Sequence, residues 1–376
     1  MNNPLAQITT FGQSIWLDYI RRSFIASGEL KKLIDEDNLK GLTSNPAIFE
    51  EAIAHSEDYA EVIGTLAKTD ISTEDIFLAL AIEDVQAAAD LFQGVYQETN
   101  GLDGYVSLEV SPGLALDTEG TIKEARSSWK TLDRKNVMIK IPGTKEGLPA
   151  IEQLISEGMN INVTLLFSLD RYREVAEAYI AGLEKRVANG EPVDQVASVA
   201  SFFLSRIDTM VDPILEDFMK NNAHKGTAAR QIHGKVAIAS ARVAYRIYKE
   251  LFHSDRFKAL AEKGAKPQRL LWASTSTKNP LFADVMYIEA LIGPETVNTV
   301  PKETLNAYRD HGNPADRLEA GIEEAQWVLY ELEDVLEVSL PDITKKLEEE
   351  GIAKFTKPFD SLMKVLEQKR QESAVS

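Results

Sequence analysis

Short apolar runs alternate along the chain with longer segments whose hydrophobic residues recur at helical spacing. Eight runs have the length and aliphatic content of buried strands, and they occupy Ser14–Tyr19, Leu39–Ser44, Tyr105–Val110, Val137–Ile141, Asn160–Phe167, Val196–Phe203, Arg269–Ser274 and Thr296–Val300. Strands separated by helices pair in parallel through right-handed crossovers. Eight such units predict an α/β fold, a closed (β/α)₈ TIM barrel, rather than an open doubly wound sheet.

Several of the intervening segments carry recognisable helix ends. The segment that includes Lys31–Ile34 is expected to end near Asn38, and Gly158 favours a left-handed cap after a later helix. Ser168 is placed to cap the helix that follows it. The apolar residues of Thr227–Phe252 stay on one side, which predicts one long helix.

Two regions exceed what a plain barrel needs. Pro46–Gly104 is long for one connection, so additional helices are expected between the second and third strands. From about Lys302 onward the chain reads as helices only, and Ile343–Glu372 is amphipathic, so it is expected to pack across the barrel or against a second subunit. With no Gly-, Pro- or Ser-rich linker, we expect one barrel domain over residues 1–376, with a C-terminal helical extension from about residue 335 to 376.

The composition is that of a globular protein, with 44% hydrophobic and 27% charged residues. No apolar stretch approaches the ~18 residues of a membrane span, so no membrane association is expected. The first residues lack a basic region followed by an apolar core, so we expect no secretory signal. The absence of cysteine excludes disulfides, thiol nucleophiles and thiolate metal sites, and it fits a cytoplasmic location.

The formal net charge of −18 disfavours nucleic acid as a partner. It leaves room for a small anionic substrate, because a few cations in a cleft can override the overall field. The five histidines include no pair at helical i,i+4 spacing, so a HExxH-type metal site is excluded. Neither GxGxxG nor GxxxxGK[ST] occurs, so the usual nucleotide-binding fingerprints are missing.

Lys140 stands out because it interrupts the apolar run Val137–Ile141. Lysine is almost never fully buried without a partner, and burial lowers the pKa of its amine. A neutral amine is what Schiff-base chemistry needs. The simpler alternative is a lysine at a strand end whose stem packs while its head reaches water.

Polar residues gather at the carboxyl ends of the expected strands, where barrel enzymes place their catalytic groups. These are Asp18, Thr43, Ser44, Asn45, Ser107, Glu109, Lys140, Asn162, Thr164, Ser201, Arg206, Ser274, Ser276 and Lys278. Side chains alternate along a strand, so Ser107 and Glu109 share one face, as do Asn162 and Thr164. Because a buried polar group without a partner costs roughly 1–3 kcal/mol, their convergence indicates a site rather than packing.

A lysine with two carboxylates is suited to iminium chemistry. Lys140 could attack a ketone and form an iminium, while Asp18 and Glu109 supply the acid and the base for breaking or forming a carbon–carbon bond. Thr164 and Glu109 could hold the water that imine formation sheds and regains. The residue types therefore predict an imine-forming lyase or transferase.

The other candidates suit a phosphorylated sugar. Asn45 and Asn162 could bind hydroxyl groups through their amides. Arg206 and Lys278 could bind a phosphate, the arginine through its planar fork and the lysine as a point charge. Arg206 could instead bridge an aspartate on its own helix, and the neighbouring Phe203 is expected to be core.

Structural explanations stay open for three of these features. Asp18 could simply cap a helix that begins beyond it. Thr43–Pro46 reads equally well as a turn and a helix start. Glu109 could form a purely structural buried ion pair with Lys140.

The same stretches resemble the transaldolase family in its longer bacterial form. The resemblance is carried, between about Ser14 and Gly312 and in family order, by TSNPAIFE, VSLEV, MIKIPGTKEG, NINVTLLFS, ASFFLSRID and LWASTSTKNP. It implies a (β/α)₈ barrel and a step of the non-oxidative pentose phosphate pathway. In that step a dihydroxyacetone unit passes from sedoheptulose 7-phosphate to glyceraldehyde 3-phosphate, giving erythrose 4-phosphate and fructose 6-phosphate.

The resemblance also implies roles for the candidate residues. Lys140 would be the Schiff-base lysine, Asp18 the acid/base in carbon–carbon cleavage, and Glu109 with Thr164 the groups that handle water. The substrate-binding set would be Thr43, Asn45, Ser107, Asn162, Ser201, Arg206, Ser274 and Lys278. No metal or organic cofactor is implied, phosphorylated sugars are the expected partners, and the candidate assembly is a homodimer.

One departure from the family pattern affects the phosphate site. Shorter classical members have a second phosphate-binding arginine after the seventh strand, where this chain has Ser274–Lys278. We expect Lys278, helped by Ser274, to take that role, with Ser276 as the alternative. Two other functions stay open: an imine-forming aldolase that releases free dihydroxyacetone, and an idle barrel that senses sugar phosphates.

Overall fold

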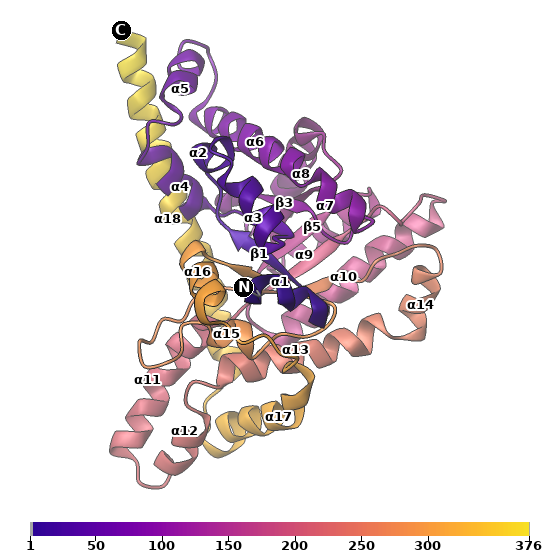
Figure 1. Cartoon of the computed structure of the whole chain (residues 1–376), viewed down its shortest axis with the longest axis vertical. Coiled ribbons are helices and arrows are strands. Elements are labelled where there is room, and N and C mark those ends of the chain that lie inside the picture. The colour runs from indigo at the N-terminus through magenta and orange to yellow at the C-terminus, as the bar shows by residue number, and fades with distance from the viewer. Residues whose placement is uncertain (1–2, 376) are drawn as a thin grey trace.

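Eight parallel strands close into a barrel in chain order in the computed structural model, which describes residues 3–375 (Figure 1). The strands are β1 Gln13–Asp18, β2 Gly41–Thr43, β3 Tyr105–Glu109, β4 Val137–Pro142, β5 Ile161–Leu166, β6 Ser198–Phe203, β7 Arg269–Ala273 and β8 Thr296–Val300. The barrel closes where β8 pairs with β1. Each expected strand is present, and the (β/α)₈ prediction is confirmed.

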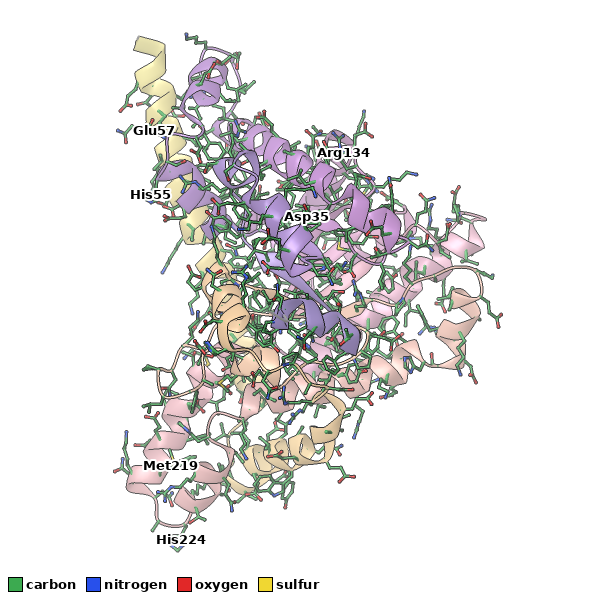
Figure 2. The ribbon with its side chains drawn as sticks, viewed as in Figure 1. Asp35, His55, Glu57, Arg134, Met219 and His224 are labelled. Carbon is green, nitrogen blue, oxygen red and sulfur yellow. The ribbon has the colours of Figure 1, made fainter. Side chains whose placement is uncertain are left out.

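Helices surround the barrel, and polar side chains at the surface include Asp35 on a helix, and His55 and Arg134 in segments that follow helices (Figure 2). The helices between consecutive strands after β3 are α8 Thr118–Leu132, α9 Gly147–Ser156, α10 Leu169–Ala188, α11 Ser205–Asn221, α12 Gly226–Ile232, α13 Val236–Phe252, α14 Asp255–Ala261 and α15 Met286–Glu289. The first part of the chain adds α1 Pro4–Ile8, η1 Thr9–Phe11, α2 Arg22–Ala26 and α3 Glu29–Asp37, and η2 Pro112–Leu114 follows β3.

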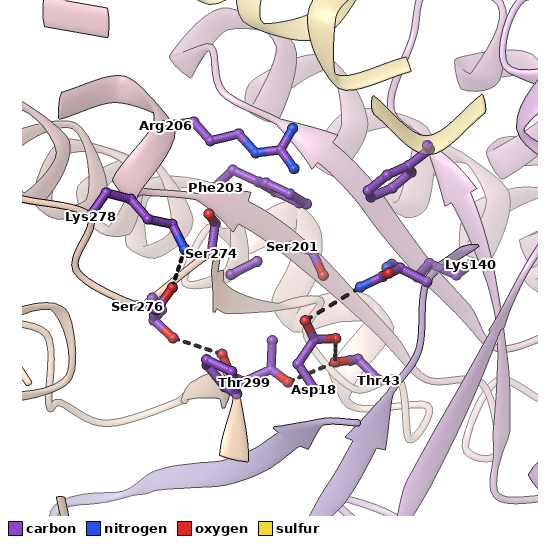
Figure 3. A pocket seen from close by; sticks show the side chains of 15 residues that line it. Asp18, Thr43, Lys140, Ser201, Phe203, Arg206, Ser274, Ser276, Lys278 and Thr299 are labelled. Carbon is purple, nitrogen blue, oxygen red and sulfur yellow. Dashed lines mark hydrogen bonds between the residues drawn. The ribbon is translucent and has the colours of Figure 1, made fainter. Parts of the chain in front are cut away.

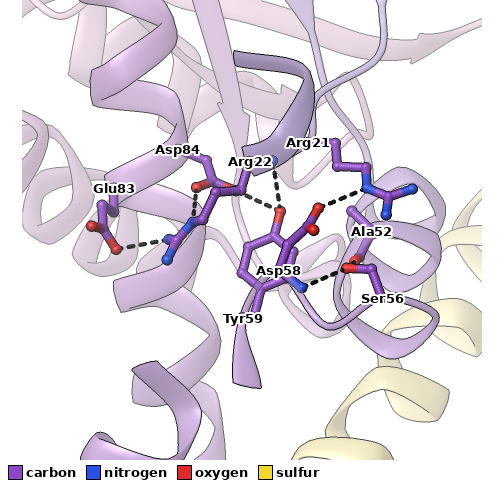
Figure 4. A network of polar contacts seen from close by, with 8 residues as sticks. All are labelled: Arg21, Arg22, Ala52, Ser56, Asp58, Tyr59, Glu83 and Asp84. Carbon is purple, nitrogen blue, oxygen red and sulfur yellow. Dashed lines mark hydrogen bonds and ion pairs between the residues drawn. The ribbon is translucent and has the colours of Figure 1, made fainter. Parts of the chain in front are cut away.

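The additional helices between β2 and β3 are present as expected: α4 Pro46–Ala54, α5 Ala60–Leu66, α6 Thr73–Leu91 and α7 Gln93–Glu98. A polar network ties them to α2 (Figure 4). Arg22 Nε donates to Asp84 at 2.9 Å, and the Tyr59 hydroxyl donates to the same carboxylate at 2.7 Å while accepting from the Arg22 backbone N–H. Burial raises the pKa of Asp84, and the hydrogen bond from Tyr59 and the charge of Arg22 oppose that rise.

Local helix signals behave largely as the sequence indicates. Asn38 ends α3 with a positive φ of 57°, Gly158 follows α9 with a φ of 90°, and Ser168 caps α10 by accepting the Arg171 N–H. The single helix expected over Thr227–Phe252 is wrong, because the segment divides into α12 and α13 at Gly234, whose φ is 71°.

The division at Gly234 has a tertiary cause. The freed Gly234 N–H donates to Asp212 at 2.9 Å, and the Ala237 N–H at the start of α13 donates to Asp208 at 2.8 Å. Both carboxylates belong to α11 and satisfy backbone groups that a helix terminus leaves without intrahelical partners. Glycine adopts the left-handed turn without a Cβ penalty.

After β8 the chain is helical, as expected: α16 Lys302–His311, η3 Glu319–Gly321, α17 Ile322–Tyr330, the π-helical turn η4 Glu331–Val335 and α18 Leu340–Val375. Helix α18 packs across the barrel, against α4, α6, α11 and β5, and runs along one side of the molecule in Figure 1. Gly351 permits this close approach, because a Cβ there would lie 3.0 Å from Leu165 Cδ2. Within residues 3–375, no helix combines the length and apolar character needed to cross a membrane.

The amino-terminal end of the barrel is closed by a buried ion pair. Arg269 Nη2 lies 2.8 Å from Asp103 Oδ1, and their side chains are only 6% and 5% exposed. Ser14 Oγ and Trp16 Nε1 also donate to Asp103, at 2.7 and 3.1 Å. The charged groups are therefore paired and hydrogen-bonded, which is the condition for burying them.

We expect Asp103→Ala to lower the free energy of unfolding by about 3–5 kcal/mol, because it leaves the Arg269 guanidinium buried without its counter-ion. Chemical unfolding followed by circular dichroism measures the change. The control is Asp255→Ala, which removes an ion pair whose carboxylate is 99% exposed and should change stability by less than about 1 kcal/mol. Equal effects of the two substitutions would contradict a structural role for the buried pair.

Candidate active site

A cavity of about 220 Å³ opens at the carboxyl ends of the strands (Figure 3). Its walls combine one buried amine, one carboxylate, several hydroxyls and two further cations. They are formed by Asp18, Thr43, Asn45, Lys140, Ser201, Phe203, Arg206, Ala273, Ser274, Thr275, Ser276, Lys278, Thr299, Pro301 and Phe355. The structure thus brings together residues from six strands or their following loops and from α18.

Lys140 is buried at this end of β4, with only 4% of its surface exposed. Its Nζ donates to the Ser44 carbonyl at 3.0 Å and forms an ion pair with Glu109 Oε2 at 3.1 Å. The β3–β4 register explains the second contact, because Glu109 and Lys140 are direct neighbours across the sheet. The alternative in which the head of Lys140 reaches water is therefore wrong. The buried ion pair between Lys140 and Glu109 is confirmed as a contact.

The two carboxyl groups near Lys140 both have raised pKa values. Burial raises the pKa of Glu109 to about 7, with a smaller contribution from Asp18, while the positive charge of Lys140 opposes the rise. Burial also raises the pKa of Asp18, and the charge of Lys140 and a hydrogen bond from Thr43 act in the opposite direction. A carboxyl with a pKa near neutrality can both give and take a proton at physiological pH.

Asp18 is held by side chains from the β2 end. Thr43 Oγ1 donates to Asp18 Oδ1 at 2.7 Å, and Asn45 Nδ2 approaches Asp18 Oδ2 at 3.5 Å. Among the described residues Asp18 caps no helix, whereas Asn45 does cap α4 by accepting the Ile48 N–H. For Asn45 the helix-start interpretation and the site interpretation therefore both hold.

A chain of hydrogen bonds lies beneath the cavity floor. Ser201 Oγ donates to Asn162 Oδ1 at 2.7 Å, and Asn162 Nδ2 donates to Ser107 Oγ at 3.0 Å. Ser201 lines the cavity, but Asn162 and Ser107 are fully buried behind it and do not. The two deeper residues therefore orient Ser201.

Thr164 also lies outside the cavity wall. It is fully buried on β5, opposite Pro142 of β4, and its Oγ1 has no hydrogen-bond partner within residues 3–375. The next residue, Leu165, has a φ of 59°, and the β5–β6 register shifts between Val163 and Leu166. Such irregularities re-aim side chains and cluster at functional sites.

Glu109 faces a different space from Lys140. It borders a second cavity, of about 10 Å³, with Asn45, Pro46, Phe49, Phe77, Val110, Ser111, Pro112 and Phe359. That volume suits about one water molecule. The amine thus opens to the large cavity, and its carboxyl partner opens to the small one.

The cations Arg206 and Lys278 lie at the far side of the large cavity from Lys140 (Figure 3). Arg206 lies over the Phe203 ring, 5.6 Å from its centroid, and its Nη1 is buried without a hydrogen-bond partner in the described part of the chain. Burial lowers the pKa of Arg206. Burial and the charge of Arg206 both lower the pKa of Lys278, which donates to Ser276 Oγ.

Two cations with lowered pKa values in one cavity would be stabilised by a bound anion.

The alternative that Arg206 bridges Asp208 or Asp212 on its own helix is wrong. The carboxylate of Asp208 accepts from Tyr287 and the Ala237 N–H, and that of Asp212 accepts from the Gly234 N–H.

Six wall residues were not expected as site residues from the sequence, namely Phe203, Ala273, Thr275, Thr299, Pro301 and Phe355. Three of them have side chains that matter for the geometry of the site. Phe203 is buried as predicted, but it also faces the cavity beneath Arg206. Thr299 Oγ1 lies 2.7 Å from Thr43 Oγ1, and a polar residue just before the end of β8 could have signalled it. Phe355 comes from α18, and nothing in its local sequence indicates which part of the barrel it contacts.

Metal ligands were not expected, and the cavity wall contains neither histidine nor a second carboxylate. Among the described residues, Glu50, Glu51 and His55 form one group close enough together to share a metal ion. They lie at the surface around α4, outside both cavities, and clustered surface acids are common without a metal. The side chains that the wall of the large cavity offers for chemistry are thus one buried amine, the Asp18 carboxyl group, several hydroxyls and two further cations.

Comparison with known proteins agrees with this geometry. The chain matches the family described as "Transaldolase/Fructose-6-phosphate aldolase" over residues 15–366. It is 50% identical over 372 residues to "Transaldolase" of Trichodesmium erythraeum, with 98% of each chain covered. It is 48% identical to "Transaldolase 2" of Nostoc sp., covering 98% of this chain and 97% of the relative. "Transaldolase" of Saccharopolyspora erythraea is 44% identical, with 99% of each chain covered. The chain belongs to the transaldolase/fructose-6-phosphate aldolase family.

Proposed function

We propose that the protein is a transaldolase that carries a dihydroxyacetone unit on Lys140. The unit passes from sedoheptulose 7-phosphate to glyceraldehyde 3-phosphate, giving erythrose 4-phosphate and fructose 6-phosphate. The observation that carries this proposal is the buried Lys140 amine, 3.1 Å from Glu109 and in one cavity with Asp18. The names of the relatives support it.

Imine formation begins when Glu109 takes a proton from Lys140, leaving a neutral amine. The amine attacks the C2 carbonyl of the ketose, and the carbinolamine then loses water as an iminium forms. Glu109, with a pKa of about 7, returns a proton to the departing hydroxyl. The small cavity beside Glu109 and the unpaired Oγ1 of Thr164 are suited to hold that water.

Carbon–carbon cleavage depends on Asp18. Its carboxylate takes the proton of the C4 hydroxyl, the C3–C4 bond breaks, and its electrons move to the iminium to form an enamine. The donor's remaining part leaves as an aldehyde, and a second aldehyde enters and reacts in reverse. Thr43 and Asn45 orient Asp18 for both proton transfers.

The hydroxyl and phosphate groups of the sugar are bound along the rest of the cavity. Ser201, held by Asn162 and Ser107, and Asn45 bind hydroxyls near the reacting carbons. Arg206 and Lys278 bind the phosphate, with Ser274 and Ser276 beside them. This assigns the role of the missing second arginine to Lys278, whose ammonium already contacts Ser276.

Five broader properties complete the proposal: domain number, location, assembly, the absence of a nucleic-acid partner and the absence of a cofactor. We propose a single domain, since α18 packs directly on the barrel, and a cytoplasmic homodimer. The net charge of −18 argues against nucleic acid as a partner. The reaction needs no cofactor, so activity should persist in a metal chelator. Light scattering tests the dimer.

Two other functions make different demands on the same site. An aldolase would release free dihydroxyacetone from fructose 6-phosphate without an acceptor, and the family description includes such an activity. A sensor would bind sugar phosphates without covalent chemistry, and it would have no need of a buried amine between two carboxyl groups. Product analysis with and without an acceptor aldehyde separates all three.

Borohydride reduction in the presence of fructose 6-phosphate should add the mass of a reduced dihydroxyacetone unit to the peptide that carries Lys140. The enamine left after cleavage is in equilibrium with an iminium, which borohydride reduces to a stable amine. Lys140→Ala should abolish the adduct, whereas Lys145→Ala, at an exposed position nearby, should keep it. An adduct on another lysine would refute the assignment.

Arg206→Ala should raise KM for fructose 6-phosphate about 10–100-fold, since a charge-assisted hydrogen bond contributes roughly 1.5–3 kcal/mol. The effect should fall mainly on KM, because the phosphate is bound in both ground and transition states. Turnover of unphosphorylated fructose serves as the control and should change little. Equal losses for both sugars would show that Arg206 does not bind the phosphate.

The acidic side of the pH profile should report Glu109. Below about pH 7 its carboxyl is protonated and cannot take the Lys140 proton, so kcat/KM should fall as pH decreases. Glu109→Gln should be slow throughout and should lose this acidic limb. Glu119→Gln, at an exposed position, should keep the wild-type profile. A wild-type rate that is constant from pH 5 to 8 would be incompatible with the proposal.

A further inference from the structure

Helix α18 places an aromatic ring against the reactive amine. Phe355 is 6% exposed, lines the large cavity, and has its ring centroid 5.6 Å from Lys140 Nζ. The wall also contains the polar residues Asp18, Thr43 and Asn45, and the aromatic ring of Phe203 lies beneath Arg206. Phe355 is thus an apolar part of the wall beside the amine on which the covalent intermediate forms.

The position of Phe355 is fixed on both sides along the helix. One turn earlier, Gly351 lets α18 approach Leu165 closely. One turn later, Phe359 packs edge-on against Phe77, with ring centroids 5.4 Å apart and planes at 88°. Phe77 in turn packs edge-on against Phe49, at 5.6 Å. The ring of Phe355 therefore belongs to a packed apolar layer rather than to a loose segment.

Polar contacts hold the following part of α18 on the helices added between β2 and β3. Thr73 Oγ1 donates to Glu367 at 2.8 Å, Ser361 Oγ donates to Glu50 at 3.3 Å, and Arg370 Nη1 donates to the Ile71 carbonyl at 3.1 Å. The extra helices of this chain thus support the helix that completes the cavity.

Phe355 and Phe359 line different cavities. Phe355 lines the large cavity with Lys140, and Phe359 lines the small cavity with Glu109, which has room for about one water molecule. Each ring gives its cavity an apolar surface that offers water no hydrogen-bond partner, and Asn45 borders both cavities.

The enamine that follows cleavage has two possible fates. It can add to an acceptor aldehyde, which makes a new carbon–carbon bond and completes transfer. Alternatively, a proton from water or an acid adds to its C3 carbon and regenerates an iminium. Water then adds at C2, the carbon–nitrogen bond breaks, and dihydroxyacetone leaves while Lys140 recovers its amine.

We propose that Phe355 determines which fate prevails. Its ring covers the Lys140-bound enamine and excludes the water that would discharge it before an aldehyde arrives. Phe355 is thus a specificity-determining residue that favours transfer over release of dihydroxyacetone. This inference rests on the proposed Schiff-base function.

The test compares wild type, Phe355→Leu and Phe355→Ala. The measured quantity is the ratio of two rates: release of free dihydroxyacetone from fructose 6-phosphate alone, and transfer to erythrose 4-phosphate. We expect the ratio to rise about tenfold in Phe355→Ala and less in Phe355→Leu, whose side chain still fills part of the space. Phe355→Leu decides the matter if the alanine variant does not fold.

Leu366→Ala is the matched control, because Leu366 is fully buried on α18 but lines neither cavity. It should lower thermal stability and leave the ratio unchanged. An unchanged ratio in folded Phe355 variants that still form the Lys140 borohydride adduct would overturn this inference alone. A wild-type protein that forms no adduct would overturn the proposed function and the inference together.

Discussion

The fold serves to bury one amine next to one carboxyl group. Lys140 and Glu109 are neighbours across β3 and β4, and both are almost fully removed from solvent. Desolvating such a pair is unfavourable, and the attraction between the two charges offsets that penalty only with good geometry and additional hydrogen bonds. The Ser44 carbonyl supplies one such bond to the amine. Burial also raises the pKa of Glu109 to about 7. The same burial that destabilises the charged pair therefore makes Glu109 useful for proton transfer.

Buried polar groups in the barrel differ in how completely they are hydrogen-bonded. At the amino-terminal end, Asp103 accepts from Arg269, Ser14 and Trp16, and the network is closed. At the carboxyl end, Thr164 Oγ1 and Arg206 Nη1 are buried without hydrogen-bond partners in the described chain. Buried atoms without partners also occur at the amino-terminal end, at Gln13 Oε1 and Gln268 Oε1, but of these residues Arg206 alone lines the large cavity, where a ligand can supply the missing contact. The position of that cavity matches the general placement of active sites at the carboxyl ends of barrel strands.

The sequence predicted the strands well because each is a compact apolar run, and the carboxyl ends of those strands located most polar wall residues, including Asp18, Lys140 and Ser201. Its failures have tertiary causes. The break at Gly234 depends on two aspartates of α11 that capture backbone N–H groups. The contact of Phe355 with Lys140 depends on how α18 crosses the barrel, which no local pattern encodes. Strand parity also could not reveal that Asn162 and Ser107 lie behind Ser201 rather than in the wall.

The hydrogen-bond chain from Ser201 through Asn162 to Ser107 has a direction, and that direction has a consequence for the ligand. Since the Ser201 hydroxyl gives its only proton to the Asn162 carbonyl oxygen, it turns lone pairs alone toward the cavity. A group bound there must itself carry a hydrogen to give. A sugar hydroxyl satisfies this demand, whereas a ketone, an ether or a fluorine at the same carbon does not. The buried amide thus selects for a hydrogen-bond donor on a ligand group that it does not touch.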